Sequence, residues 1–131
     1  MKIIEGSSFK DNRGFIRFII DFDLEKVRRM YLIKPEKNVI RAWQGHKKES
    51  KWFFVLSGSF QVQTINMLDL NHRQSIFLNS NENKVLNIEP GNYNGFLALE
   101  ESSELLVFSD QTLKESKEDD FRLTLEDLKW L

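Results

Sequence analysis

Short apolar stretches separated by polar turns run along most of the chain, and they predict strands rather than helices. The stretches are rich in Phe, Val and Ile, and they recur at intervals near the ~8–12 residues typical of sandwiches and barrels. Nine strands are expected, at residues 14–22, 27–33, 39–46, 51–56, 59–65, 74–78, 84–88, 96–99 and 104–109. The pattern therefore predicts an all-β protein.

Turn-forming residues lie between these strands, at 35–38, 57–58, 79–83 and 90–92. They are the Pro, Gly, Asn and Ser residues that impose or tolerate turn dihedrals. The C-terminal part differs, since residues 114–120 are charged and expected to be solvated. Further on, Thr124 and Asp127 form a capping-box-like pair ahead of leucines at helical spacing. We expect a short C-terminal helix over residues 124–131.

Two neighbouring strands differ in the faces they present. Residues 60–64 alternate cleanly, so one face is buried and the other polar. Residues 52–56 are apolar on both faces, so the outer face also needs a cover. A second subunit or the C-terminal helix could supply that cover, and the sequence leaves both open. We predict a homodimer, with Trp43 at the interface; a monomer mass by light scattering would contradict it.

Composition excludes several classes of partner and chemistry. Lys and Arg total 19 against 20 Asp and Glu, so the net charge of −1 predicts no nucleic-acid or membrane partner. There is no Cys, which excludes a disulfide framework, a thiolate metal site and a cysteine nucleophile. No signal peptide and no run of 18 apolar residues is found. We expect one domain, residues 1–131, in the cytoplasm.

One strand carries polar residues where core residues belong. Counting by twos along residues 39–46 puts Gln44 and His46 on the face of Ile40, and Arg41 on the opposite face. If Ile40 marks the interior, Gln44 and His46 point into the barrel. Burying a polar group costs free energy unless the group is hydrogen-bonded. The two side chains therefore either form hydrogen bonds within the protein or line a water-filled pocket. Lys51, at the start of the next strand, favours the pocket.

Acid/base chemistry is the reaction class that these residues favour. The only histidines are His46 and His72, and His72 lies in a polar stretch expected to be an exposed turn, so we predict no metal and no cofactor. No Ser lies on a sharp Gly-flanked elbow, which argues against a nucleophile triad. Abstracting a proton next to a carbonyl needs a base and a positive group at the enolate oxygen. His46 fits the first role, and Lys51 or Arg41 the second.

The segments RAWQGHKK and SKWFFVLSGSF resemble a known group of enzymes. They are similar to R-G-F-H-A-H-K-K and V-L-S-G-S of the cupin-fold dTDP-4-keto-6-deoxyglucose 3,4-ketoisomerases, which are related to the dTDP-4-dehydrorhamnose 3,5-epimerases. FKDNRGFI resembles the epimerases' opening, RRMYLIK the ketoisomerases' R-V-Y-Y-I, and IEPGNYNGFLAL the motif I-P-P-G-x-x-H-G-F-x-x-L. LLVFSD and DDFRLTLEDL resemble the ketoisomerases' closing strand and tail. The resemblance covers nearly the whole chain.

This resemblance implies an RmlC-like cupin jelly-roll barrel, a dimer and no metal. It implies that His46, at the second His of the ketoisomerase pair, is a catalytic acid/base residue, and that Arg41 assists the active site if a bulge turns it inward. Lys51 falls on an epimerase Lys associated with the carbonyl oxygen or phosphates. Arg13 falls on an Arg that approaches the nucleotide diphosphate, and Tyr31 on a pocket-side Tyr.

The chain departs from the resembled family at three positions. Gln44 replaces the first His of the pair, the family's principal base, and Asn94 replaces the His of H-G-F. Both amides could bind the sugar, but neither takes a proton at pH 7. The epimerase Tyr falls on Val107, which disfavours double epimerisation.

The function predicted is that of an isomerase or epimerase of a nucleotide-linked 4-keto-6-deoxy sugar, working through an enolate in bacterial surface polysaccharide biosynthesis. His46→Asn is then expected to abolish turnover and leave the fold intact. The alternatives are a catalytically silent cupin that binds a nucleotide sugar or regulates a sugar-modifying partner, and a structural dimer module without ligand.

Overall fold

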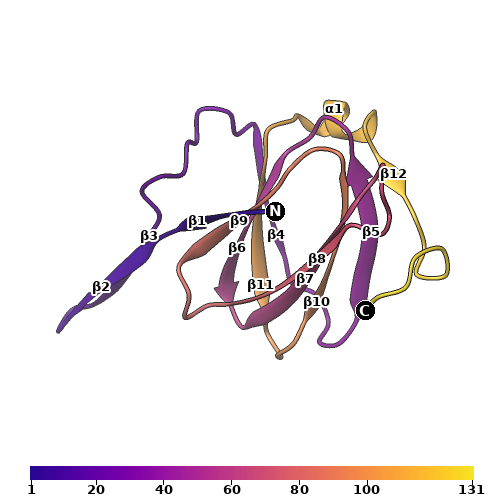
Figure 1. Ribbon diagram of the computed structural model, residues 1–131. Helices are drawn as coiled ribbons and strands as arrows, with labels where there is room; N and C mark the ends of the chain where they lie inside the picture. The colour runs from indigo at the N-terminus through magenta and orange to yellow at the C-terminus, as the bar shows by residue number, and fades with distance from the viewer.

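The computed structural model describes residues 1–131, whose strands form two facing antiparallel sheets (Figure 1). The first sheet has the order β1 (Lys2–Glu5), β9 (Lys84–Ile88), β6 (Lys51–Ser57), β11 (Glu104–Ser109) and β4 (Arg29–Ile33). The second has the order β12 (Phe121–Arg122), β5 (Ile40–His46), β10 (Asn92–Ala98), β7 (Ser59–Asn66) and β8 (Arg73–Asn79). β2 (Ser7–Asp11) and β3 (Gly14–Phe18) form a separate hairpin, and α1 (Leu113–Lys117) is the one helix.

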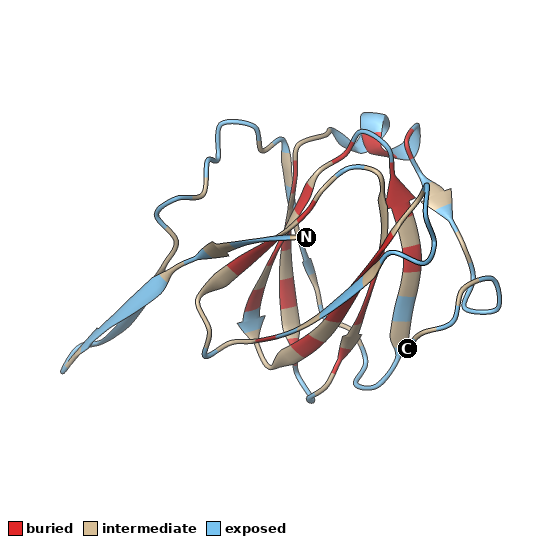
Figure 2. Ribbon diagram, in the orientation of Figure 1, coloured by how far each residue is buried: buried red, intermediate tan, exposed pale blue.

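The hydrophobic core lies between the two sheets (Figure 2). Alternating inward side chains of β6, β7, β9, β10 and β11 supply most of it, and three rings meet edge to face: Phe53 and Phe60 each pack against Phe96. Removing a buried ring of this kind costs about 3–5 kcal/mol. This core fixes the positions of the strands around the cavity described below.

All nine predicted strands are present, so the all-β prediction is confirmed. The ranges 84–88 and 104–109 match the observed strands at both ends. Gly58 and Gly91 have φ of 74° and 85° in the turns expected at 57–58 and 90–92, a conformation that glycine adopts without strain. The sequence missed β1, β2 and the two-residue β12, and it began the strand of β10 four residues late.

The C-terminal helix is not where the sequence predicted it. Thr124 and Asp127 do exchange capping hydrogen bonds, but the chain makes only one turn there. The helix is α1, which overlaps the stretch expected to be only solvated, and a capping box of Thr112 and Glu115 begins it. The prediction of a helix at 124–131 is wrong: beyond that turn Trp130 packs on Trp43 and its indole N–H donates to Gln61, so the tail is fixed by contacts with the second sheet.

The placement of Trp43 at an interface is also wrong. Its side chain is 2% exposed because the chain's own tail covers it: Trp130 stacks on it at 5.4 Å, and its indole N–H donates to the carbonyl of Leu128. The tail therefore covers the second sheet, and not the outer face of β6 in the first.

Part of the outer face of β6 is covered by the segment that contains β3 and the residues after it. Phe22 packs against Trp52 and Phe108, with ring centroids 5.7 and 5.2 Å apart, and the guanidinium of Arg17 lies 4.6 Å from the ring of Phe54. No helix in the structure is long and apolar enough to span a membrane.

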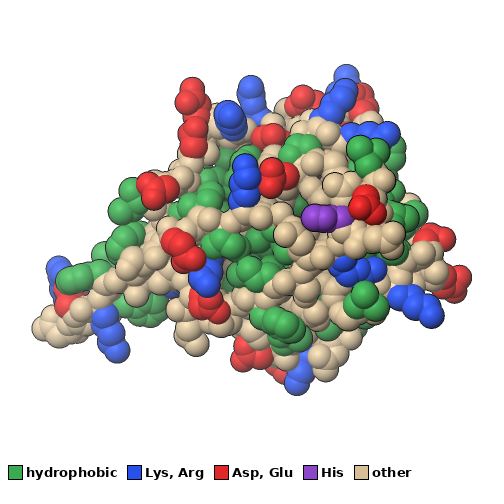
Figure 3. Space-filling model, viewed as in Figure 1, with side chains coloured by type: hydrophobic (Ala, Val, Ile, Leu, Met, Phe, Trp, Pro, Cys, Tyr) green, Lys and Arg blue, Asp and Glu red, His purple; other side chains and the backbone are tan.

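The β2–β3 hairpin projects from the barrel as an arm (Figure 1). Its two strands pair only with each other. Three large apolar side chains on it, Phe9, Phe15 and Ile16, are 55%, 67% and 61% exposed, and Figure 3 shows hydrophobic side chains along its length. The arm thus presents apolar surface that this chain does not itself cover.

Candidate active site

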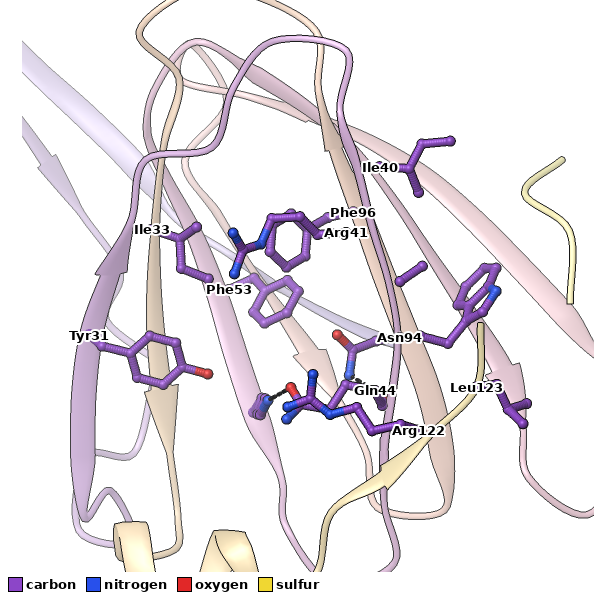
Figure 4. Close-up of a pocket in the computed structure, with 13 residues that line it drawn as sticks. Tyr31, Ile33, Ile40, Arg41, Gln44, Phe53, Asn94, Phe96, Arg122 and Leu123 are labelled. Atoms are coloured by element: carbon purple, nitrogen blue, oxygen red, sulfur yellow. Dashed lines mark hydrogen bonds between the residues drawn. The ribbon is translucent and has the colours of Figure 1, made fainter. Parts of the chain in front are cut away.

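A cavity of about 370 Å³ lies within the barrel, between strands of both sheets (Figure 4). This volume is at the lower end of the range usual for small-molecule sites. The residues that line it are Tyr31, Ile33, Ile40, Arg41, Ala42, Trp43, Gln44, Lys51, Phe53, Asn94, Phe96, Arg122 and Leu123. Five residues predicted from the sequence are among them: Tyr31, Arg41, Gln44, Lys51 and Asn94.

A bulge in β5 brings Arg41 into the cavity. The pairing of β10 with β5 shifts between Asn94, which pairs with Gln44, and Phe96, which pairs with Arg41, so β5 has one extra residue there. The extra residue changes the alternation, and Arg41 and Gln44 then share the inner face (Figure 4). The guanidinium of Arg41 lies 5.9 Å from the ring of Phe96. The sequence analysis required a local bulge for Arg41 to turn inward, and β5 has such a bulge.

Gln44 is held at both ends of its amide. Its Oε1 accepts a hydrogen bond from Nζ of Lys51 at 2.9 Å, and its Nε2 donates to Asp120 at 3.1 Å. Asp120 is also paired with Arg122, at 3.0 Å. Because a carboxamide is neither protonated nor deprotonated near neutral pH, Gln44 orients Lys51 and does not itself perform acid/base chemistry.

Lys51 is the cavity residue with the most perturbed titration. Burial lowers its pKa to about 8, with the negative charge of Glu49 opposing the shift and the positive charge of Arg29 adding to it. Its side chain is 3% exposed, and its one hydrogen-bond partner in the structure is the neutral amide of Gln44. A lysine in this state exchanges a proton near neutral pH.

Tyr31 reaches the cavity from β4, with its hydroxyl pointing inward (Figure 4). Burial raises its pKa, and the negative charge of Glu49 raises it further while Arg29 opposes the shift. The hydroxyl therefore stays protonated and can donate a hydrogen bond to a ligand oxygen.

His46 lies behind the cavity in a buried polar cluster, and not among the residues that line it. Its Nδ1 is 2.5 Å from the main-chain oxygen of Asp119, and its Nε2 is 2.8 Å from the carboxylate of Glu49. Both neighbours are groups of the protein itself. His46 therefore places both ring nitrogens against protein groups and does not line the cavity.

Glu49 is the centre of this buried cluster. Besides His46, its carboxylate accepts hydrogen bonds from Ser109, from Ser116 at 3.1 Å and from Arg29 at 3.1 Å. Burial alone would raise its pKa, but the contacts with His46 and Ser109 and the charge of Lys51 lower the pKa to about 2. The cluster ties the loop after β5 to β4, β11 and α1.

Asn94 lines the cavity, whereas Arg13 does not. Asn94 is 4% exposed and donates to the main-chain carbonyl of Gln44 at 3.0 Å, so it braces β10 against β5 beside the cavity. Arg13 is near the tip of the arm, where it pairs with Asp11, and it does not line the main cavity. Asp69–His72 form the exposed turn that was predicted.

Arg122 is the cavity residue that sequence reasoning missed. β12 pairs with β5 and places Arg122 opposite Gln44. Together with Arg41 and Lys51 it makes the cavity wall cationic, with Asp120 as the nearby acid. In the sequence, DDFR stands out only as part of a tail that resembles the ketoisomerases', because nothing in it signals a two-residue strand. No group of three or more His, Asp or Glu side chains is placed to hold a metal ion.

Comparison with known proteins assigns the family. The profile of the family described as "FdtA: WxcM-like, C-terminal" matches residues 1–123. The chain belongs to this family. No curated protein matched the sequence. The resemblance inferred from the sequence is thereby confirmed at family level.

Solved structures of two kinds of sugar-nucleotide enzyme are similar to this member of the family. A double mutant of the QdtA 3,4-ketoisomerase from Thermoanaerobacterium thermosaccharolyticum, in complex with TDP, is 25% identical with a TM-score of 0.76, covering 93% of this chain and 86% of its own. The dTDP-4-dehydrorhamnose 3,5-epimerase from Sulfolobus tokodaii is 23% identical with a TM-score of 0.79, covering 98% and 79%. The RmlC epimerase from Mycobacterium tuberculosis is 17% identical with a TM-score of 0.79, covering 92% and 67%. They confirm the RmlC-like cupin fold.

Proposed function

We propose that the cavity binds a nucleotide-linked 4-keto-6-deoxy sugar and isomerises or epimerises it by proton transfer through an enolate. One observation carries this proposal: three cations and a tyrosine hydroxyl converge on a cavity in the barrel of a family whose structural relatives include a ketoisomerase in complex with TDP. Such a step would supply a sugar donor for a bacterial surface polysaccharide made from cytoplasmic nucleotide sugars.

Each cavity residue has a role in the proposed reaction that follows from its chemistry. Arg41 and the hydroxyl of Tyr31 stabilise the negative charge that develops on the keto oxygen. Asn94 and Gln44 keep β5 and Lys51 in place and leave part of their amides for sugar hydroxyls. His46 acts from behind, by fixing the loop that leads from Gln44 to Lys51.

A homodimer is part of the proposal. The arm carries Arg13 away from the chain's own cavity and presents three exposed apolar side chains. We propose that the arm packs on a second copy, where Arg13 approaches the nucleotide diphosphate. Phe15→Glu is then expected to give a monomer in light scattering with an unchanged circular dichroism spectrum; a wild-type monomer would contradict the dimer.

The experiment is proton NMR of the protein with TDP-4-keto-6-deoxyglucose in deuterated water. Loss of a ring-proton signal together with a new 3-keto sugar supports ketoisomerisation, and loss without that product supports epimerisation. Substrate incubated without protein is the control, because keto sugars exchange slowly by themselves. An exchange rate no higher than that control would contradict the enzyme proposal.

A second candidate function is that of a silent cupin that only binds a nucleotide sugar. The observation that favours it is the pair Gln44 and Asn94, because neither amide can act as a base. In the same spectra this candidate predicts broadened thymine signals, which show binding, and no exchange above the control.

A further inference from the structure

Four ionisable side chains line the cavity, and only one of them can exchange a proton near neutral pH. Arg41 and Arg122 keep their protons at any physiological pH. Tyr31 also stays protonated, since burial raises its pKa. His46 is not among the residues that line the cavity, and both of its ring nitrogens lie against protein groups. Lys51 remains.

We propose that Lys51 is the catalytic acid/base residue, and not only a positive charge at the keto oxygen. This inference rests on the proposed function, and it answers how a chain with Gln44 at the position of the family's base could still transfer a proton. The amide of Gln44 accepts from Nζ of Lys51 at 2.9 Å and so holds the amine at the cavity wall that both residues line.

The charges around Lys51 come from several elements, whereas its partners on the neighbouring strands, Ile88 on β9 and Ser109 on β11, are uncharged. Glu49 lies on the loop before β6, Arg29 and Tyr31 on β4, Arg41 on β5, and Asp120 and Arg122 on the chain around β12. Burial and the positive charges favour the neutral amine, whereas the two carboxylates favour the ammonium. The balance gives a pKa of about 8, which leaves roughly a tenth of the amine unprotonated at pH 7. This is in the range that lysine bases in enzymes use.

The reaction balances without any further reagent. The neutral amine removes the hydrogen from the carbon next to the ketone: the C–H bond breaks, an N–H bond forms, and the electron pair becomes the C=C bond of an enolate. The ammonium, whose protons exchange with solvent, then gives a proton to the former ketone carbon. The proton of the neighbouring hydroxyl passes to the former ketone oxygen, so the ketone has moved by one carbon and no atom is gained or lost.

The first test is the pH profile of kcat/KM for the wild-type protein with TDP-4-keto-6-deoxyglucose. With Lys51 as the base, the rate rises tenfold per pH unit and levels off near pH 8, the pKa of the buried amine. An imidazole base would instead give a plateau from about pH 6.5. A plateau there would overturn the inference.

The second test replaces the amine. Lys51→Gln is expected to lower kcat by about 10²- to 10⁴-fold, the usual contribution of a general base, while TDP affinity stays within a few-fold. Lys48→Gln is the matched control, because Lys48 is exposed on the neighbouring loop. A Lys51→Gln protein that folds, binds TDP and keeps more than a tenth of the wild-type kcat would overturn the inference.

Chemical rescue separates a catalytic amine from a structural one. Since the chain has no Cys, the Lys51→Cys variant can be alkylated with bromoethylamine at that single position. The alkylation is done in denaturant and followed by refolding, with wild type taken through the same cycle. Recovery of kcat, with a pH profile that again rises toward an amine pKa, supports the inference. A refolded, TDP-binding, alkylated protein without activity would overturn it.

These outcomes also separate this inference from the proposed function. If wild type exchanges ring protons but the profile, the Lys51→Gln variant and the rescue go against Lys51, the isomerase proposal stands with another base. If wild type binds TDP and exchanges no ring proton, the isomerase proposal fails, the inference fails with it, and the silent-binder function is supported.

Discussion

Two polar clusters on the same strand, β5, differ in how completely their charges are paired. Around His46, the fully buried carboxylate of Glu49 is paired with Arg29 and His46, and the carboxylate of Asp119 accepts hydrogen bonds from three main-chain N–H groups. Around Gln44, two residues earlier, the cavity holds Arg41, Lys51 and Arg122 with Asp120 as the nearby acid. Satisfied networks stabilise a fold, whereas an excess of one charge facing a cavity is the arrangement expected of a ligand site. We therefore assign structure to the first cluster and chemistry to the second.

The largest effect is expected when the paired cluster is broken. Glu49→Gln leaves Arg29 and His46 buried without their anion, so the free energy of unfolding should fall by about 3–5 kcal/mol. Urea denaturation measures this change. Glu101→Gln, at an exposed position, should stay within about 0.5 kcal/mol of wild type. Equal effects of the two substitutions would contradict a structural role for the cluster.

Acid should weaken the same cluster in the wild-type protein. The folded pKa of Glu49 is about 2, below its usual 4.5, so its stabilisation is complete above pH 4.5 and is lost as the pH falls toward 2. This loss is worth about 3 kcal/mol. Urea denaturation of wild type and Glu49→Gln from pH 6 to 2 should show a gap that closes in acid; a constant gap would contradict the depressed pKa.

The cavity cluster should respond to pH in a different window, at alkaline pH. The folded pKa of Lys51, about 8, is below its usual 10.5, so the unfolded state binds more protons between these values and stability rises with pH across this window. Below pH 8 the buried charge carries its full cost, and Lys51→Met should therefore stabilise the protein by about 1–3 kcal/mol at pH 7. Thermal unfolding checks this, with Lys48→Met as the control. A destabilised Lys51→Met variant would mean that Lys51 contributes to the fold.

The smallest effect is expected at the rim of the cavity. Arg122 has a 67% exposed side chain and is already paired with Asp120, so Arg122→Gln should weaken TDP binding by only about 2- to 5-fold. Isothermal titration calorimetry measures this, and Arg28→Gln, on an exposed loop, is the control. No change in TDP affinity would place the nucleotide away from β12.

The sequence predicted the strands well because alternation and turn residues are local signals. It also predicted five of the residues that meet in the cavity. The bulge in β5 depends on the pairing with β10, so it could be named only as a condition for Arg41. His46 was expected inside because strict alternation places it with Gln44, but the loop that follows draws it to Glu49 and Asp119. Arg122 and the tail over Trp43 depend on contacts between distant residues, which no local pattern contains.

The central claim is that the cavity cluster carries the chemistry and the His46 cluster carries the fold. Ring-proton exchange by Lys51→Gln and by His46→Gln, each measured per folded molecule in deuterated water beside wild type, tests it most directly. We predict that Lys51→Gln keeps its melting temperature within a few degrees and loses exchange, whereas His46→Gln melts lower and still exchanges. Exchange that survives in Lys51→Gln and disappears in a well-folded His46→Gln protein would contradict the claim.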